Sequence, residues 1–211
     1  MKKFLSIVAI SLLLVLSTAC GNETGILAME DSSYVNTIVR SAEFPIYESI
    51  EHLAENATDI LRVEILDERV EVINTWIPPQ NEYEDTGMDM SDVYFVFTVH
   101  RVRVQEVFQG NAQVGDIIEV MQHGGETDEV RIVFTDKVSF EEGDDLVLFL
   151  HSWINMDGVA SLANPLQSAY RFTTANDDAR LRNLNDELES LNSKNDLTLT
   201  LNDLSWISQE R

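Results

Sequence analysis

Residues 61–72 read LRVEILDERVEV, and they hold the pattern that decides the fold class. Apolar side chains occupy odd positions up to Ile65 and even positions from Val70 onward, so the alternation changes phase near residues 66–69. Alternation is typical of a β-strand with one buried face, and a change of phase within one strand indicates a bulge or a turn. We therefore predict a long, bent strand here.

A second stretch, residues 93–104, shows the same change of phase. Its apolar residues are odd-numbered up to Val99 and even-numbered at Val102 and Val104, which predicts a bulge around His100-Arg101. Bulged, bent strands let a small antiparallel sheet close on itself. The expected fold is mainly β: a small antiparallel barrel with bulged strands, accompanied by peripheral and C-terminal helices.

The run LVLFL at residues 146–150 is apolar on both faces, so this strand is expected to be central and covered, with Leu148 fully buried. Helical spacing predicts three helices around the sheet. The first follows Pro45 and carries Tyr47, Ile50 and Leu53; the second is capped by Asn176 and carries Leu181, Leu184, Leu188 and Leu191; the third starts at a capping box, Thr200 to Asp203.

The N-terminus has the order of a secretion signal. A basic start at residues 1–3 is followed by an apolar run at residues 4–16, and Ser17-Thr18-Ala19 precedes Cys20, the only cysteine. This stretch resembles the lipobox of bacterial lipoproteins, which implies a lipid on the Cys20 sulfur and cleavage before that residue. A transmembrane anchor is the alternative, but the run is shorter than the ~20 residues that a spanning helix needs.

The resemblance divides the chain into three parts. Residues 1–19 are expected to be the lipoprotein signal peptide, and residues 20–43 the lipidated cysteine and a flexible tether. Residues 44–211 are expected to form a single β-barrel domain, with the C-terminal helices at about 173–211. The expected location is the cell membrane, where the lipid would hold the protein on the extracytoplasmic face.

The chain is strongly acidic, with a formal net charge of −23. Loss of the signal peptide would remove Lys2 and Lys3 and bring the charge to −25. Nucleic-acid binding depends on Lys and Arg that neutralise phosphates, so this composition excludes a nucleic-acid partner. Anionic headgroups would be repelled too, so the expected membrane contact is the Cys20 lipid alone.

Turn glycines and strand hydrophobics carry a second resemblance, which spans residues 57–172. ATDI at 57–60, VFQGN at 107–111, VGD at 114–116 and FEEGDDLVLFL at 140–150 look like small secreted barrels of bacteria, similar in outline to the OB-like modules of netrins and metalloproteinase inhibitors. The resemblance implies an OB-like barrel. It implies fold rather than function, and the disulfides of the animal modules are absent.

No catalytic motif follows, and we expect no catalytic residues, no metal and no cofactor. His100, His123 and His151 lie in or beside predicted strands, where they could converge on Zn²⁺, although isolated histidines are usually structural. The acidic loop within residues 76–92 lacks the ligand spacing of an EF-hand. A hydrolase or metal-dependent enzyme of the envelope is therefore the alternative function.

Aromatic residues near predicted loops are the better candidates for a ligand site. Trp76 and Tyr83 lie in the long loop, and Trp153 follows a strand. Together they could form a platform for an envelope glycan, peptide or protein, or each could simply cover one end of the barrel. The expected function is thus that of a non-enzymatic binding or interaction module.

The lipidation site yields a direct prediction. Cys20→Ala removes the only thiol that a diacylglycerol could join, so an uncut precursor should accumulate and metabolic labelling with a radioactive fatty acid should be lost. Ser17→Ala, which keeps the cysteine, serves as the control and should still be labelled. Labelling of the Cys20→Ala protein at the wild-type level would contradict the assignment.

Overall fold

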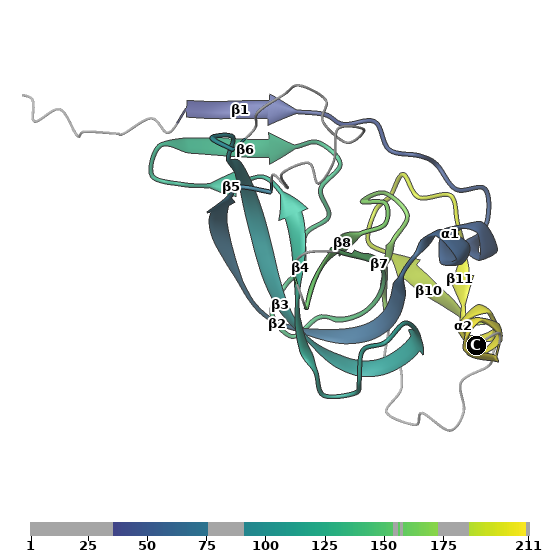
Figure 1. The fold of residues 1–211 in the computed structure, drawn as a ribbon. Coiled ribbons are helices and arrows are strands. Elements are labelled where there is room, and N and C mark those ends of the chain that lie inside the picture. Colours follow the sequence, from purple (N-terminus) through teal and green to yellow (C-terminus); the bar gives the residue numbers. More distant parts are fainter. Residues whose placement is uncertain (1–35, 76–90, 154–155, 157, 173–185, 210–211) are drawn as a thin grey trace, which may run out of the picture. The chain divides into compact units, whose positions relative to one another are not determined.

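The computed structural model describes residues 36–75, 91–153, 156, 158–172 and 186–209, all within one compact unit, residues 35–211 (Figure 1). These residues form mainly β structure with two short helices. The elements are β1 (Asn36–Arg40), α1 (Ile50–Asn56), β2 (Asp59–Ile73), β3 (Phe95–Gln109), β4 (Ile117–His123), β5 (Gly125–Glu126), β6 (Val130–Phe134), β7 (Asp145–Ser152), β8 (Val159–Leu162), β9 (Ala169–Arg171), β10 (Glu187–Ser190), β11 (Leu199–Thr200) and α2 (Leu201–Gln209).

Eight of these strands form one sheet in the order β11-β10-β9-β7-β2-β3-β4-β8. Strand β8 also pairs with β7, so the pairing leads from β7 through β2, β3, β4 and β8 back to β7. All neighbours in this sheet are antiparallel except β4 and β8, which are parallel. A smaller sheet has the order β1-β6-β5.

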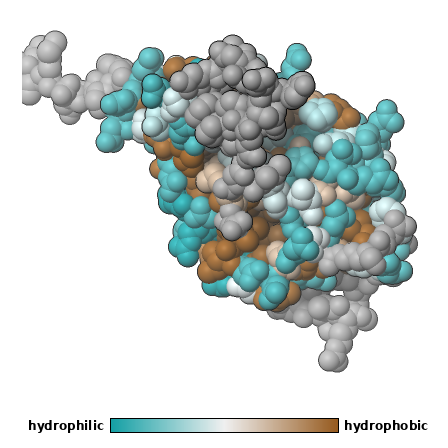
Figure 2. Space-filling model, in the orientation of Figure 1, coloured by the Kyte–Doolittle hydropathy of each residue, from teal (hydrophilic) through white to brown (hydrophobic). Residues whose placement is uncertain are grey.

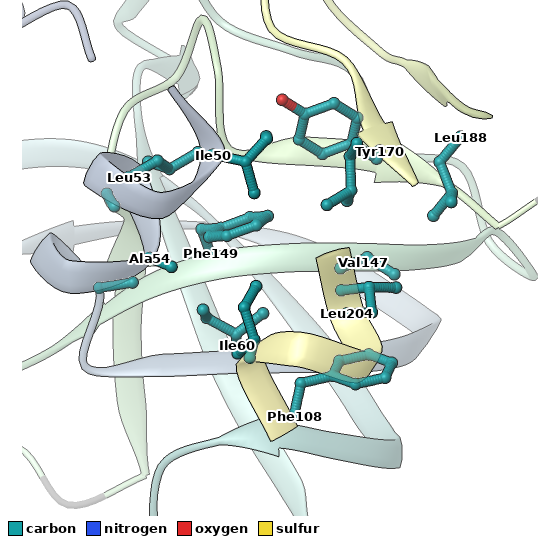
Figure 3. Close-up of a cluster of buried hydrophobic side chains, with 14 of the residues drawn as sticks. Ile50, Leu53, Ala54, Ile60, Phe108, Val147, Phe149, Tyr170, Leu188 and Leu204 are labelled. Atoms are coloured by element: carbon teal, nitrogen blue, oxygen red, sulfur yellow. The ribbon is translucent and has the colours of Figure 1, made fainter. Parts of the chain in front are cut away.

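Strand β7 is buried on both faces, as its sequence predicts. Val147 and Phe149 pack in one hydrophobic cluster with residues of α1 and α2, whereas the even-numbered leucines pack in another with residues of β2, β3, β4 and β8. In Figure 3, Phe149 lies between α1, which carries Ile50 and Leu53, and the strand that carries Tyr170. The two cores are therefore separated by the strand itself.

The predicted bulge in residues 66–69 is present. Ile65 pairs with Val102 and Asp67 pairs with Arg101, so Leu66 is the extra residue on β2. Two further register shifts lie between Ile60 and Leu61 and between Arg62 and Val63, and there the extra residues, Phe108 and Gln105, are on β3. The bulges make both 15-residue strands bend, as Figure 1 shows.

The predicted bulge at His100-Arg101 is wrong. The pairing of β3 with β4 runs without a shift across both residues. The apolar pattern changes phase there because the two halves of β3 bury opposite faces: Val99 packs in a cluster with Phe97, and Val102 and Val104 pack in the cluster that contains the β7 leucines. A strand whose two halves are buried on opposite faces therefore shows the same change of phase in its sequence as a bulged strand.

Two of the three predicted helices are present in the described residues. Helix α1 starts after Ser49, whose hydroxyl accepts a hydrogen bond from the backbone N–H of His52 at 3.2 Å, so it begins later than Pro45 suggested. Helix α2 has the predicted capping box, in which Asp203 N–H donates to the Thr200 hydroxyl at 3.2 Å and Thr200 N–H donates to the Asp203 carboxylate at 2.8 Å. Neither of these helices is long and apolar enough to span a membrane.

The helix predicted from Asn176 to Leu191 is wrong in its second half. Residues 173–185 lie outside the described part, but residues 187–190 form strand β10, which pairs with β9 and β11. Leu188 packs in the cluster around Phe149. Its helical spacing is overridden because the open edge of β9 offers backbone hydrogen bonds and the cluster offers burial.

The tether predicted for residues 20–43 also needs correction at its end. Residues 36–40 form strand β1, which pairs in parallel with β6 from Asn36 opposite Val130 to Arg40 opposite Phe134. The pairing satisfies backbone groups that a free tether would leave to water, which composition alone does not reveal. Residues 20–35, like the signal peptide, lie outside the described residues.

Leu148 has no exposed surface, as predicted. Leu148→Ala should lower the free energy of unfolding by about 2 to 5 kcal/mol, because transfer energy is lost and a cavity is left. Val114→Ala, at a position with 69% exposure, is the control and should change it by less than ~0.5 kcal/mol. Urea denaturation measures both, and equal effects would show that β7 does not support the two cores.

Candidate functional site

Aromatic rings gather on one face of β3 and β4. Phe97 and His123 are register partners, so their side chains share a face, and their ring centroids are 4.5 Å apart. Phe95 lies 6.3 Å from His123, and Phe134, the last residue of β6, lies 5.5 Å from it. Trp153 follows β7 and meets Phe97 edge to face at 6.0 Å. Three strands and the residue that follows β7 thus contribute to one aromatic cluster.

A pocket of about 160 Å³ lies beside this cluster. Its aromatic lining is formed by Phe44, Phe97, His123, Phe134 and Trp153. The remaining lining residues are polar or aliphatic and come from β4, β8 and the segments after β6 and β8: Met121, Gln122, Asp136, Lys137, Ser161, Leu162 and Pro165. The pocket therefore has large apolar walls and a few polar groups, which is the usual composition of a small-ligand site.

Of the two charged side chains that line the pocket, Asp136 forms a salt bridge with a described residue and Lys137 does not. Asp136 accepts from Lys194 at 2.9 Å, so its charge is compensated. The Lys137 ammonium donates to the Thr98 hydroxyl at 2.5 Å, and no carboxylate among the described residues forms a salt bridge with it. Burial lowers the pKa of Lys137, and partial desolvation of the stacked imidazole lowers the pKa of His123, which favours its neutral form.

Below the pocket, β3 carries a buried polar residue, His100, with 1% exposure. Its ring packs on Phe140 with centroids 4.8 Å apart, and its Nε2 lies 3.2 Å from Gln122 Nε2. Nδ1 has no hydrogen-bond partner and lies 3.5 Å from a carboxylate oxygen of Glu68, which is itself 61% exposed. Burial, with a smaller contribution from Lys137, lowers the pKa of His100 to about 4, because a carboxylate in water offsets little of the desolvation.

A second, larger cavity of about 530 Å³ lies beyond Trp153, near the starts of β2 and β4. Its two carboxylates are engaged within the fold. Asp59 accepts from the Ser152 hydroxyl at 2.5 Å, and Asp116 accepts from the backbone N–H of Gln113 at 2.9 Å. These contacts hold loop geometry, so the carboxylates have a structural role, and the aromatic pocket is the better candidate site.

Of the residues predicted from sequence to bind a ligand, Trp153 lies in the wall of both cavities. Trp76, Tyr83 and the lipidation site Cys20 lie outside the described residues, as does the acidic loop up to residue 90. The structure thus places one member of the predicted aromatic platform in the wall of a pocket and does not describe the others.

The histidines that could have shared a metal ion are not brought together. His100 and His123 lie on opposite faces of the sheet, since positions 100 and 97 of β3 differ in parity and His123 is the register partner of Phe97. Across the described ranges, no group of three His, Cys, Asp or Glu side chains is placed to hold a metal ion.

Sequence reasoning missed three residues of this site, Phe97, Phe134 and Lys137, and it considered His123 only as a possible metal ligand. Each matches an ordinary strand or turn pattern, and their contacts join positions 11 to 56 residues apart along the chain. The only local signal was the pair Phe95 and Phe97, two large aromatics on one strand face. Comparison of the sequence with protein-family models and with curated proteins finds no match.

The environment of His100 predicts a pH dependence of stability. Its pKa is about 4 in the folded chain and about 6.5 when unfolded, so between these values the unfolded state binds the proton and stability falls as the pH falls. From pH 7 to pH 5 the contribution of His100 should shrink by about 2 kcal/mol.

Urea denaturation of the wild type and of His100→Gln at both pH values gives the loss of unfolding free energy of each protein between pH 7 and pH 5. The difference between the two losses is the contribution of His100, since the other groups titrate alike in both proteins. His52→Gln, at an exposed position on α1, is the control and should keep the pH dependence of the wild type. If His100→Gln loses as much stability as the wild type over this range, the buried imidazole is not the group responsible.

Proposed function

We propose that this protein is a lipid-anchored, extracytoplasmic binding module whose β domain is an OB-like barrel. The pairing of β7, β2, β3, β4 and β8 in a ring supports the barrel. The single parallel pair in that ring, between the third and fifth strands β4 and β8, agrees with a five-stranded Greek-key barrel of the OB type. The signal sequence and Cys20 support the location.

The observation that carries the proposal is the aromatic pocket. In OB-type barrels, ligands bind on the face of the second and third strands and between the loops that follow the first and fourth strands. Here β3 and β4 are the second and third strands of the ring, and Trp153 lies directly after the fourth. This position of the pocket supports a ligand site there.

The chemistry of the walls limits what could bind. Aromatic faces stack on rings and apolar groups, which suits a sugar ring, an apolar side chain of a peptide or a protein loop. A nucleic acid does not suit a chain of formal charge −23. We therefore infer a glycan, peptide or protein ligand of the envelope, bound without chemical change.

Intrinsic fluorescence of Trp153 tests this function directly. A full chain in which Trp76 and Trp206 are replaced by Phe reports on Trp153 alone, and it is titrated with chitotetraose and with N-acetylphenylalaninamide. Saturable change with either probe is expected. In calorimetry on the otherwise unchanged chain, Trp153→Ala should weaken the binding about threefold to tenfold, which is ~0.5–1.5 kcal/mol of lost stacking.

Trp206→Ala is the matched control, because Trp206 lies on α2 with 37% exposure and does not line either cavity. It should leave the affinity unchanged. Binding of neither probe would contradict the proposed function. A different result is that Trp153→Ala unfolds while the milder variant Trp153→Phe binds with unchanged affinity. That result would show that the tryptophan only covers one end of the domain.

A further inference from the structure

One lysine that lines the pocket forms no salt bridge with any carboxylate of the described residues. Of the nine Lys and Arg among the described residues, seven form salt bridges with carboxylates, and only Arg40 and Lys137 do not. Arg40 is exposed on β1, whereas Lys137 is partly buried and lines the pocket. In a chain with 37 acidic residues, a lysine of this kind is a notable exception.

The other titratable groups near Lys137 do not supply the missing charge. Asp136 is paired with Lys194. Glu68 attracts the Lys137 ammonium, but it is 61% exposed to water and forms no salt bridge with it. His123 and His100 are both shifted toward their neutral forms by burial. Asp136 and Lys137 carry opposite charges in the lining, but Asp136 is already paired with Lys194, so the charge left unpaired among the described lining residues is that of Lys137.

The ammonium of Lys137 is held in place but is not saturated. It donates to the Thr98 hydroxyl at 2.5 Å, and that hydroxyl donates in turn to the Gly124 carbonyl at 2.8 Å. An ammonium has three N–H donors, so further hydrogen bonds are available to an acceptor in the pocket. Because Lys137 is partly buried, a charge-assisted hydrogen bond to its ammonium gains strength, since little water competes for it.

The size of the pocket defines the apolar part of the ligand. A cavity of about 150 Å³ in another protein holds one benzene molecule, and this pocket is of about 160 Å³. Phe97, Phe134 and Trp153 supply flat faces for a single ring or for a branched aliphatic chain.

We propose that Lys137 is the anion-binding group of this pocket and that its ligand is a carboxylate joined to one aromatic ring or one branched apolar chain. The proposal rests on the binding function inferred above and names the ligand class for the same site. Two sources carry this chemistry: a small free acid, and the C-terminal residue of a peptide. A small free acid consists only of the apolar group and the carboxylate. The C-terminal residue of a peptide also carries an amide nitrogen on the carbon next to the carboxylate.

The test compares acids with their amides in the full chain that reports on Trp153. The first pair is 3-phenylpropanoate and 3-phenylpropanamide, and the second is N-acetylphenylalanine and N-acetylphenylalaninamide. Each acid should bind about tenfold or more tightly than its amide. Tighter binding of N-acetylphenylalanine than of phenylpropanoate assigns the site to a peptide C-terminus, and the reverse order assigns it to a free acid.

Two substitutions locate the effect. Lys137→Met keeps the length of the side chain but removes the charge, so the preference for acids should disappear while the affinity for amides stays the same. Lys137→Arg keeps the charge and should retain part of the preference. If the chain that retains Lys137 binds each acid and its amide with equal affinity, the anion proposal is overturned, and this result does not depend on the Lys137 variants. Absence of binding by all four compounds instead overturns the binding function of the pocket.

Discussion

Strand β7 carries apolar side chains that must be buried on both of its faces, and much of the domain is arranged around that requirement. Leu146, Leu148 and Leu150 belong to one core, and Val147 and Phe149 belong to the other. A strand of this kind is stable only when each face is covered by separate elements. One face is covered by the strands that pair in a ring with β7, and the other by α1, α2, β10 and β11.

The candidate site is a consequence of the same pairing. Because β8 pairs with both β4 and β7, the turn between β7 and β8 is brought next to the open face of β3 and β4. Trp153 thereby contacts Phe97, and the segment after β6 adds Phe134 and Lys137. Hydrophobic patches between hydrophilic residues are visible on the face that Figure 2 shows, which agrees with a domain whose apolar residues are not all used in its cores.

Charge distribution separates this site from the rest of the molecule. The described surface is acidic and most of its basic side chains are paired, so long-range attraction of anions is weak. At short range the balance differs, because Lys137 lies beside aromatic walls and interactions there are less screened than in water. A ligand with one carboxylate can therefore be held by contact within the pocket while the surrounding surface discourages polyanions.

Local patterns were predicted from sequence where nearest neighbours along the chain decide the outcome. The bulge at Leu66, the buried run that includes Leu148 and the capping box at Thr200 depend on strand alternation or on hydrogen bonds over three residues. Prediction failed where a distant partner decides. Leu188 has helical spacing, but the edge of β9 draws it into a strand, and residues 36–40 become a strand only because β6 lies alongside.

The sequence by itself determined the β-rich class, the buried central strand and the acidic composition, since each depends on composition or on short-range order, and it predicts a signal peptide that ends before Cys20. Only the tertiary structure decided that β7 is shared by two cores, that β3 buries opposite faces along its length, and that Phe97, His123, Phe134, Lys137 and Trp153 meet. The physical reason is that strand pairing joins residues by backbone hydrogen bonds that do not depend on side-chain identity, so partners many residues apart leave no periodic trace in the chain.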